Sequence, residues 1–309
     1  MKIRTNSNPI IRYLFTSIIG IAKFVGRNWP ELLMRIRYFA RFKRRLNLDN
    51  PKTLNEKILY MSLRTDTTSW TRLADKYSVR EYVEECGLSD ILVPLFDHWY
   101  KAEDIDFDKL PQQFVIKSTH GSGDVVIVKD KSTIDCEYIR KRMRVAVSEI
   151  YGELEGGKHY MRIKPAIIAE RLLQNDEMSS RYSSSLIDYK IWCFNGKAHY
   201  VWACSNRDSN GTEVMTYDLD WNPHPEYSVF NQHYRKGVTI PKPDNFEKMV
   251  EIVEKLAKPF PVVRIDLYNI GGQIYFGEMT FTSLGGLMHF YSDEFQKMCG
   301  DLIDVNYKG

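Results

Sequence analysis

VVRIDLYNIGGQIYFGE, residues 262–278, is the most informative stretch of this sequence. Two apolar runs rich in β-forming residues flank Gly271-Gly272, which is typical of a hairpin turn. Side chains alternate along a strand, so Arg264 and Asp266 are predicted on one face, and the turn brings Glu278 back within a residue or two of Asp266. Two carboxylates beside an arginine suit magnesium and a charged phosphate. A solvated charge ladder is the alternative, but the neighbouring residues are apolar.

A second hairpin is predicted from residues 188–194 and 197–203, which Asn195-Gly196 joins. Asp188, Lys190 and Trp192 then share one face, so that a lysine projects toward the same cleft. A helix over about 245–258 separates the two hairpins, and another begins after Ser292. Antiparallel hairpins interspersed with helices indicate an α+β or mixed α/β fold and not a doubly wound one.

The first half of the chain is predicted to begin with helices and to continue with strands. Thr53-Leu54-Asn55-Glu56 forms a capping box that starts a helix to about Arg64. A second helix is predicted over residues 71–85, closed by Gly87. Strands follow at 114–117 and 124–128, then a helix over 133–151 and an extended segment over 167–173.

The loop Lys117-Ser118-Thr119-His120-Gly121-Ser122-Gly123 lies between two predicted strands. A P-loop requires a strand followed by a helix, so that motif is excluded. A glycine-containing hairpin loop can still cover a triphosphate with its backbone N–H groups, with Lys117 reaching a phosphate. Glu170-Arg171, at the end of another strand, offers an edge that could hold an adenine or a ribose. An ordinary hairpin and a surface edge are the alternatives.

Charge is unevenly distributed along the 309 residues. The net charge is +3, but residues 1–50 carry 11 Lys and Arg against Glu31 and Asp49, which leaves the rest of the chain mildly acidic. That balance argues against a general nucleic-acid binder, whereas the basic N-terminal arm favours an anionic surface. The five cysteines are far apart and form no CxxC pair, which is typical of reduced, packed thiols in a cytoplasmic protein.

The N-terminal arm contains an apolar run, Tyr13 to Ala22, that is too short to span a bilayer. Residues 30–47 resemble a basic helix with Pro30 near its start. Two interpretations remain open. One is a helix packed on the body, and the other is an amphipathic segment in peripheral contact with the inner membrane face.

Taken in order, these segments resemble the ATP-grasp superfamily, and specifically its TupA-like branch, which is associated with teichuronopeptide and surface-polysaccharide synthesis. The resemblance covers about residues 50–290. The matching segments are Asp75-Lys76 with Tyr77-Ser78-Val79-Arg80, Phe114-Val115-Ile116-Lys117 with His120-Gly121-Ser122-Gly123, Ala169-Glu170-Arg171, Asp188-Tyr189-Lys190 with Phe194-Asn195-Gly196, and Arg264-Ile265-Asp266 with Phe276-Gly277-Glu278.

The resemblance implies an ATP-grasp-like α+β fold that holds ATP and magnesium between two subdomains. The implied segments are a helical arm (1–50), an N-terminal subdomain (51–110), a glycine-loop subdomain (111–175) and a catalytic subdomain (176–309). The implied nucleotide-binding residues are Lys76, Lys117, His120, Gly121, Ser122, Gly123, Glu170 and Lys190. Asp266 and Glu278 would hold magnesium, with Thr280 where many members have Asn, and Arg264 would stabilise charge during acyl transfer with Lys190 near the terminal phosphate.

The expected activity is ligation of a carboxylate-bearing sugar or glycan to an amine such as an amino acid, in the cytoplasm or at the inner membrane face. Residues 283–292 follow the predicted metal hairpin and would border the acceptor. Three alternatives remain: a non-catalytic binding module, a kinase of a glycan or lipid hydroxyl in the same cleft, and a glycosyltransferase. The last is suggested by Asp218-Leu219-Asp220, a DxD sequence that also suits a strand end before a turn.

Overall fold

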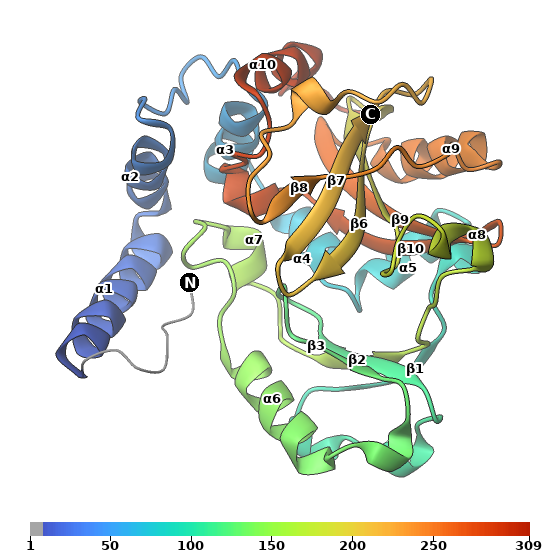
Figure 1. Ribbon diagram of the computed structural model, residues 1–309. Coiled ribbons are helices and arrows are strands. Elements are labelled where there is room, and N and C mark those ends of the chain that lie inside the picture. Colours follow the sequence, from blue (N-terminus) through green and yellow to red (C-terminus); the bar gives the residue numbers. More distant parts are fainter. Residues whose placement is uncertain (1–8) are drawn as a thin grey trace.

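The computed structural model describes residues 9–309, with side chains from Thr16 onward, and contains two β-sheets (Figure 1). The smaller sheet is antiparallel, and α6 (Cys136–Ser148) packs against it to form a separate apolar core. Its strands lie in the order β1 (Leu95–Trp99), β4 (Ile167–Glu170), β2 (Phe114–Ser118) and β3 (Val125–Val128). The first strand thus comes from the segment before residue 110 and the others from the segment after it.

The larger sheet has six strands and contains both predicted hairpins. Its order is β10 (Gln273–Thr280), β9 (Val262–Ile270), β5 (Asp188–Phe194), β6 (Lys197–Asp208), β7 (Gly211–Tyr217) and β8 (Tyr234–Lys236). Every neighbouring pair is antiparallel except β7 and β8. All seven residues of β5 are buried, so both faces of the sheet are covered. On one face Trp221 lies between Tyr189 and Phe246 of α9 (Phe246–Ala257), and Lys190 points to the other face.

Besides α9, four helices share the core of the larger sheet: α3 (Leu54–Arg64), α4 (Thr68–Ala74), α5 (Val79–Glu85) and α10 (Asp293–Leu302). The predicted capping box of α3 is confirmed, with Thr53 and Glu56 bonding to each other's backbone N–H. The single helix predicted over residues 71–85 is wrong, because the chain breaks between α4 and α5. The Asp75 carboxylate accepts hydrogen bonds from the backbone N–H (3.0 Å) and hydroxyl (2.6 Å) of Ser78. This local bonding competes with helix continuation.

The helix predicted over residues 133–151 is shorter in the structure, α6 (Cys136–Ser148). Asp135 caps its start, with its side chain accepting from the backbone N–H of Tyr138 at 3.0 Å. After α6 the chain runs through a segment of turns, residues 149–157, which we call the strap, into α7 (Lys158–Met161). The short helix α8 (Glu177–Ser180) precedes β5.

The N-terminal arm consists of α1 (Pro9–Asn28) and α2 (Pro30–Phe42), which lie beside the two sheets at the left of Figure 1. It contacts the strap through charge and close packing. Glu153 pairs with Lys23 (3.3 Å) and with Arg27, and a Cβ atom at Gly26 would overlap the carbonyl oxygen of Glu153. Residues 1–8, and the side chains of Tyr13 to Phe15 in the predicted apolar run, lie outside the description. None of the described helices has the length and apolarity needed to cross a bilayer.

Candidate active site

Charged side chains form a row across three strands of the larger sheet, on the face opposite α9. Asp266 of β9 is directly paired with Lys190 of β5 and with Glu278 of β10. The predicted proximity of Asp266 and Glu278 is therefore confirmed. A register shift between Phe276 and Glu278 marks a bulge at Gly277, whose added Cβ would crowd the Asp266 carbonyl. The next row on this face pairs Trp192, Arg264 and Thr280.

Asp266 is the buried centre of this row. Its Oδ1 accepts from Arg264 Nε at 2.7 Å, and its Oδ2 accepts from Arg264 Nη2 at 2.8 Å and from Lys190. Lys190 also pairs with Asp188 at 2.6 Å. Burial raises the pKa of Asp266, and this effect exceeds the lowering of the pKa by the positive charges of Arg264 and Lys190. Burial would lower the pKa of Lys190, but Asp188 and Asp266 outweigh it and raise that pKa, so the ammonium stays charged.

Glu278 lies at the open side of the row, with 37% of its side chain exposed. Its carboxylate accepts from Arg264 Nη2 at 3.2 Å and from the Thr280 hydroxyl at 3.1 Å, and Lys76 Nζ lies 3.9 Å away. Desolvation acts to raise its pKa, but the nearby charges of Lys76 and Arg264 prevail and lower it to about 2. Glu278 is thus an anion that faces solvent and has cations on two sides.

Lys76 connects this row to the smaller sheet. Its Nζ donates to the carbonyl of Gly121 at 2.6 Å, and its backbone N–H donates to that of Thr119 at 3.1 Å. The break after α4 thus places Lys76 against the loop that follows β2. Burial lowers the pKa of Lys76, and the positive charge of Lys117 acts in the same direction. Lys117 in turn pairs with Glu170 of the neighbouring strand β4.

A run of contacts from Lys76 to Arg207, together with the Lys117–Glu170 pair whose charges act on Lys76, makes up a set that we call the ionic cluster. Its members are Lys76, Lys117, Glu170, Asp188, Lys190, Arg207, Arg264, Asp266 and Glu278. It has five cations and four carboxylates, and it runs from the smaller sheet to the larger one. Of the predicted site residues, it brings together all the lysines, the arginine and the carboxylates.

The predicted phosphate loop has a buried and an exposed part. His120 is buried and its Nε2 lies 3.0 Å from the carbonyl of Glu149; burial lowers its pKa. Gly121 packs against the ring of Tyr151, where an added Cβ would lie 3.3 Å away. Ser122 and Gly123 are exposed, and Gly123 has φ of 94°. The exposed tip is therefore the part that is open to a ligand, and His120 is held against the strap.

The donor set fits magnesium with a limited number of protein ligands. Within the described residues, no three His, Cys, Asp or Glu side chains gather as a metal site. Magnesium commonly uses one or two carboxylates and completes its shell with water and substrate phosphates. Glu278 is ionised and partly exposed, and the Thr280 hydroxyl adjoins it. Both carboxylate oxygens of Asp266 already accept hydrogen bonds, one from Arg264 and the other from Lys190. Glu278 is therefore the more accessible of the two predicted carboxylate ligands.

Sequence reasoning missed two groups at the far end of the cluster. Arg207 lies 3.2 Å from Asp188 Oδ2, and Asp188 Oδ1 is buried without a hydrogen-bond partner among the described residues. Arg207 lies within a register irregularity between Ser205 and Asp208, so the alternation of β6 does not reveal its direction. The predicted hairpin strand ends at residue 203, so no sequence signal pointed to Arg207.

Residues 283–292 contact the cluster at one point. Ser283 accepts from Arg264 Nη1 at 2.7 Å, and a tight turn follows in which Leu284, Gly285 and Gly286 all have φ between 48° and 72°. A left-handed Leu is strained, and such strain is common next to functional sites. Tyr291 instead belongs to the core, where it accepts a hydrogen bond from the Trp192 indole.

Asp218 of the DxD sequence closes a turn after β7, as the strand-end interpretation predicted. Its carboxylate accepts from the backbone N–H of Asn222 at 2.8 Å and from that side-chain amide at 2.9 Å, and His224 lies 3.2 Å away. These contacts account for Asp218 as a turn residue, and they require no metal.

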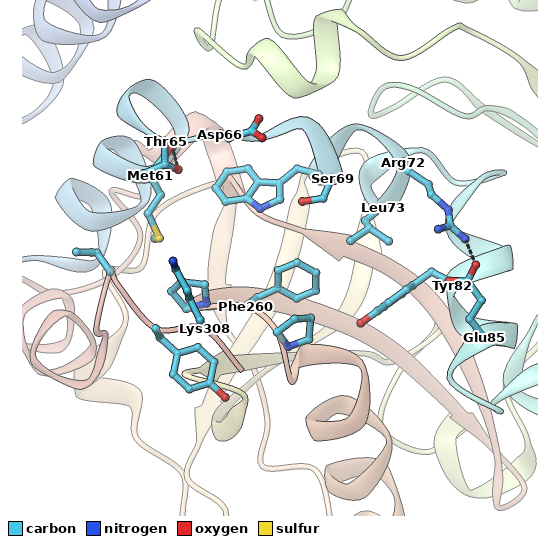
Figure 2. A pocket seen from close by; sticks show the side chains of 15 residues that line it. Met61, Thr65, Asp66, Ser69, Arg72, Leu73, Tyr82, Glu85, Phe260 and Lys308 are labelled. Carbon is cyan, nitrogen blue, oxygen red and sulfur yellow. Dashed lines mark hydrogen bonds and ion pairs between the residues drawn. The ribbon is translucent and has the colours of Figure 1, made fainter.

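A large surface pocket lies away from the ionic cluster, beside α4, α5 and the C-terminal segment (Figure 2). It has a volume of about 660 Å³ and is lined mainly by apolar groups such as Met61, Leu73 and Phe260, with Arg72 and Glu85 paired at its rim. No member of the cluster lines it. We therefore identify the candidate site by the chemistry of its charged groups and not by the volume of a pocket.

Comparisons with known proteins give a family and several distant structural similarities. The model of TupA-like ATP-grasp proteins matches residues 56–304. Among curated proteins, no significant match is found. An L-amino acid ligase from Bacillus licheniformis is 14% identical, with a TM-score of 0.49, over 90% of this chain and 63% of that one. A D-alanine–D-alanine ligase from Bacillus anthracis complexed with ATP is 17% identical, with a TM-score of 0.38, over 70% and 56%.

An ADP complex of N5-carboxyaminoimidazole ribonucleotide synthetase is 12% identical, with a TM-score of 0.44, over 69% of this chain and 46% of that one. The chain thus spans between 46% and 63% of the length of these three solved structures. These similarities are distant, whereas the family model covers most of the sequence and includes every residue of the ionic cluster. The chain therefore belongs to the TupA-like ATP-grasp family.

Proposed function

We propose that this protein is an ATP- and magnesium-dependent ligase that joins a carboxylate to an amine through an acyl phosphate. The observation that carries the proposal is the ionic cluster, which places three lysines, two arginines and four carboxylates between the two sheets. Membership of an ATP-grasp family supports ATP as the phosphoryl donor.

In this proposal the nucleotide lies between the sheets. Lys76 and Lys117 bind its phosphates, Glu170 its adenine or ribose, and Lys190 its terminal phosphate. The exposed loop tip, Ser122 and Gly123, covers the phosphates, with His120 and Gly121 as its base. Glu278, Asp266 and Thr280 hold magnesium, which when bound neutralises phosphate charge. Lys76 and Glu278 lie 3.9 Å apart, so a phosphate and its metal would separate an existing pair.

The chemistry proceeds in two displacements. An oxygen of the substrate carboxylate attacks the terminal phosphorus of ATP, forming an O–P bond as the bond to ADP breaks. The amine nitrogen then attacks the acyl carbon, phosphate leaves, and the nitrogen loses a proton. Arg264 and Lys190 stabilise the negative charge of both steps, since their acidic neighbours raise both pKa values and keep them cationic. Positioning of the two substrates and ATP supplies much of the rate enhancement, and no protein nucleophile is needed.

The proposed substrates are a carboxylate-bearing sugar or glycan, such as a uronic acid, and an amino acid, in bacterial surface-polysaccharide synthesis in the cytoplasm. This part rests on what is associated with the TupA-like branch. The strained turn at Leu284 supports the position of the acceptor, because Ser283 before it bonds to Arg264.

The first test is thermal melting with ATP plus magnesium, ADP plus magnesium, and UDP-sugars. A ligand that binds only the folded state stabilises it by about 2.7 kcal/mol at a hundredfold excess over its Kd. We expect the ATP–magnesium shift to be lost in Glu278→Gln. Glu254→Gln is the matched control, since Glu254 pairs with Lys197 on the surface, outside the cluster.

The second test is mass spectrometry of products formed from uronic acids and amino acids. Loss of water between the two substrates supports the ligase. Addition of a phosphoryl group without an amide would replace the ligase by a kinase of the same cleft. A melting shift with UDP-sugars and none with ATP would contradict both.

A further inference from the structure

The outer side of the N-terminal arm carries a continuous set of exposed apolar side chains, which we call the outer apolar face. Each of its members is more than half exposed: Ile18, Ile21, Phe24, Trp29, Leu32, Ile36 and Phe39. In α2 they recur at spacings of three and four residues, which places them on one side of the helix. Phe24 and Trp29 are in edge contact, with ring centroids 5.8 Å apart, so the face continues from α1 to α2. Apolar patches of this kind mark interaction sites.

The charges of the arm are divided between its inner side and its end. Five of its basic residues pair with acidic groups: Lys23 and Arg27 with Glu153, Arg37 with Glu155, Arg44 with Asp293, and Arg35 with Glu31. Arg41, Lys43 and Arg45, where α2 ends, are exposed, and they form no ion pair within residues 16–309. The acidic residues of the arm, Glu31 and Asp49, both already pair with Arg64. The end of the outer face is therefore positive and uncompensated.

We propose that the outer apolar face docks on an anionic phospholipid bilayer. The apolar side chains enter the boundary between headgroups and acyl chains, and Arg41, Lys43 and Arg45 meet the anionic headgroups. Charge favours this occupant over a second copy. In a two-fold dimer the same surface meets itself, and the three basic residues would find no acidic partner there. The proposal is independent of the ligase chemistry, because none of these residues belongs to the ionic cluster.

The chain contains its own probe of this contact. Trp29 is 55% exposed, and the other five tryptophans are buried. We expect vesicles of phosphatidylcholine and phosphatidylglycerol to shift the tryptophan emission to shorter wavelength, and brominated lipids to quench it. Trp29→Phe should remove both signals and keep vesicle binding, because Phe preserves an apolar group at this position.

Co-sedimentation of the full chain with the same vesicles measures affinity. We expect Leu32→Ser/Ile36→Ser/Phe39→Ser to weaken binding by about tenfold or more. The matched control is Ile127→Ser/Val145→Ser/Val238→Ser, which changes three similarly exposed apolar residues elsewhere. Arg41→Gln/Lys43→Gln/Arg45→Gln should weaken binding by roughly fivefold for each charge removed. Lys101→Gln/Lys129→Gln/Lys141→Gln, also exposed, is its control.

Binding that depends on phosphatidylglycerol, falls with salt and is lost only in the arm variants supports the proposal. No sedimentation with anionic vesicles at low salt would overturn it. A dimer in solution that the triple serine variant disrupts would also overturn it, because a second copy would then cover the face. The melting shift with ATP and magnesium should be the same in all these variants, so that failure of docking and failure of the ligase proposal are separate results.

Discussion

At the scale of single residues, Arg264 organises the candidate active site. It donates five hydrogen bonds to the side chains of Asp266, Ser283, Glu278 and Thr280. A guanidinium holds its donors in a fixed planar fork, so one side chain can orient partners on two strands and in the following turn. The orientation of both proposed carboxylate ligands therefore depends on this one residue.

Arg264→Lys should separate catalysis from nucleotide binding. An ammonium keeps the charge but cannot reproduce the fork, so we expect kcat to fall by about a hundredfold or more. The melting shift with ATP and magnesium should persist, because Lys76 and Lys117 remain. Arg140→Lys, which alters a surface pair with Glu137, is the control and should retain full activity. Full activity of Arg264→Lys would contradict the proposed role.

His159 predicts a pH dependence of stability. It is fully buried, its Nδ1 has no hydrogen-bond partner among the described residues, and burial lowers its pKa to about 3. The unfolded state gains a proton near pH 6.5 and the folded state does not, so falling pH favours unfolding. Between pH 7 and pH 5 this group should reduce the free energy of unfolding by about 2 kcal/mol.

Urea unfolding of wild type and His159→Phe at both pH values isolates this contribution. Other buried histidines remain in both proteins, so the difference between the two pH dependences belongs to His159. Equal losses of stability in the two proteins would show that His159 is not held neutral.

At the scale of elements, the break between α4 and α5 positions Lys76. Asp75 bonds to Ser78 and ends the helical run, and the backbone N–H of Lys76 then donates to the carbonyl of Thr119 in the predicted phosphate loop. An uninterrupted helix would have used that N–H for its own hydrogen-bond ladder. The position of Lys76, which we propose binds the nucleotide, thus depends on a local capping interaction.

Asp75→Ala should affect both stability and nucleotide affinity. Loss of such a side-chain cap costs about 1 kcal/mol, and the freed Lys76 should weaken ATP binding severalfold. Asp130→Ala is a matched control, because Asp130 accepts from the backbone N–H (2.9 Å) and hydroxyl (2.7 Å) of Ser132 at a surface turn. Melting temperature and ATP titration of both variants measure the two effects. Equal ATP affinity in both would contradict the positioning role.

The same elements show how far sequence predicts this fold. The hairpins at Asn195-Gly196 and Gly271-Gly272 were predictable because their turns require residues that tolerate positive φ, and both turns show it. Alternation then predicted Lys190, Arg264 and Asp266 on one face. The break at Asp75 was missed, because its local signal is a single Asp–Ser contact, and the hydrogen bond from Lys76 to Thr119 that accompanies it comes from far away in the chain. The three-residue strand β8 was also missed, because it exists only through parallel pairing with β7.

At the scale of the whole molecule, the two sheets have separate apolar cores, and the larger core also includes α3, α5 and α9. The ionic cluster joins them near the proposed nucleotide site. A ligand bound there would contact both sheets, so its binding should couple elements that the apolar cores leave independent.

Hydrogen exchange can measure this coupling. Without ligand, amides of β2 and β4 should exchange faster than those of β5 and β9, because the smaller core buries less apolar surface. ATP with magnesium should slow exchange in both sheets, and in Glu278→Gln this protection should be absent. Protection confined to the larger sheet would contradict a site that both sheets form.

Gly26 in α1 has a consequence for genetics. It faces the Glu153 carbonyl so closely that even a methyl group has no room. We therefore expect a change to alanine at this single codon to detach the arm and leave the ionic cluster in place. Under the two proposals made above, a cell carrying such an allele would make a ligase that is active in a test tube but no longer held at the membrane.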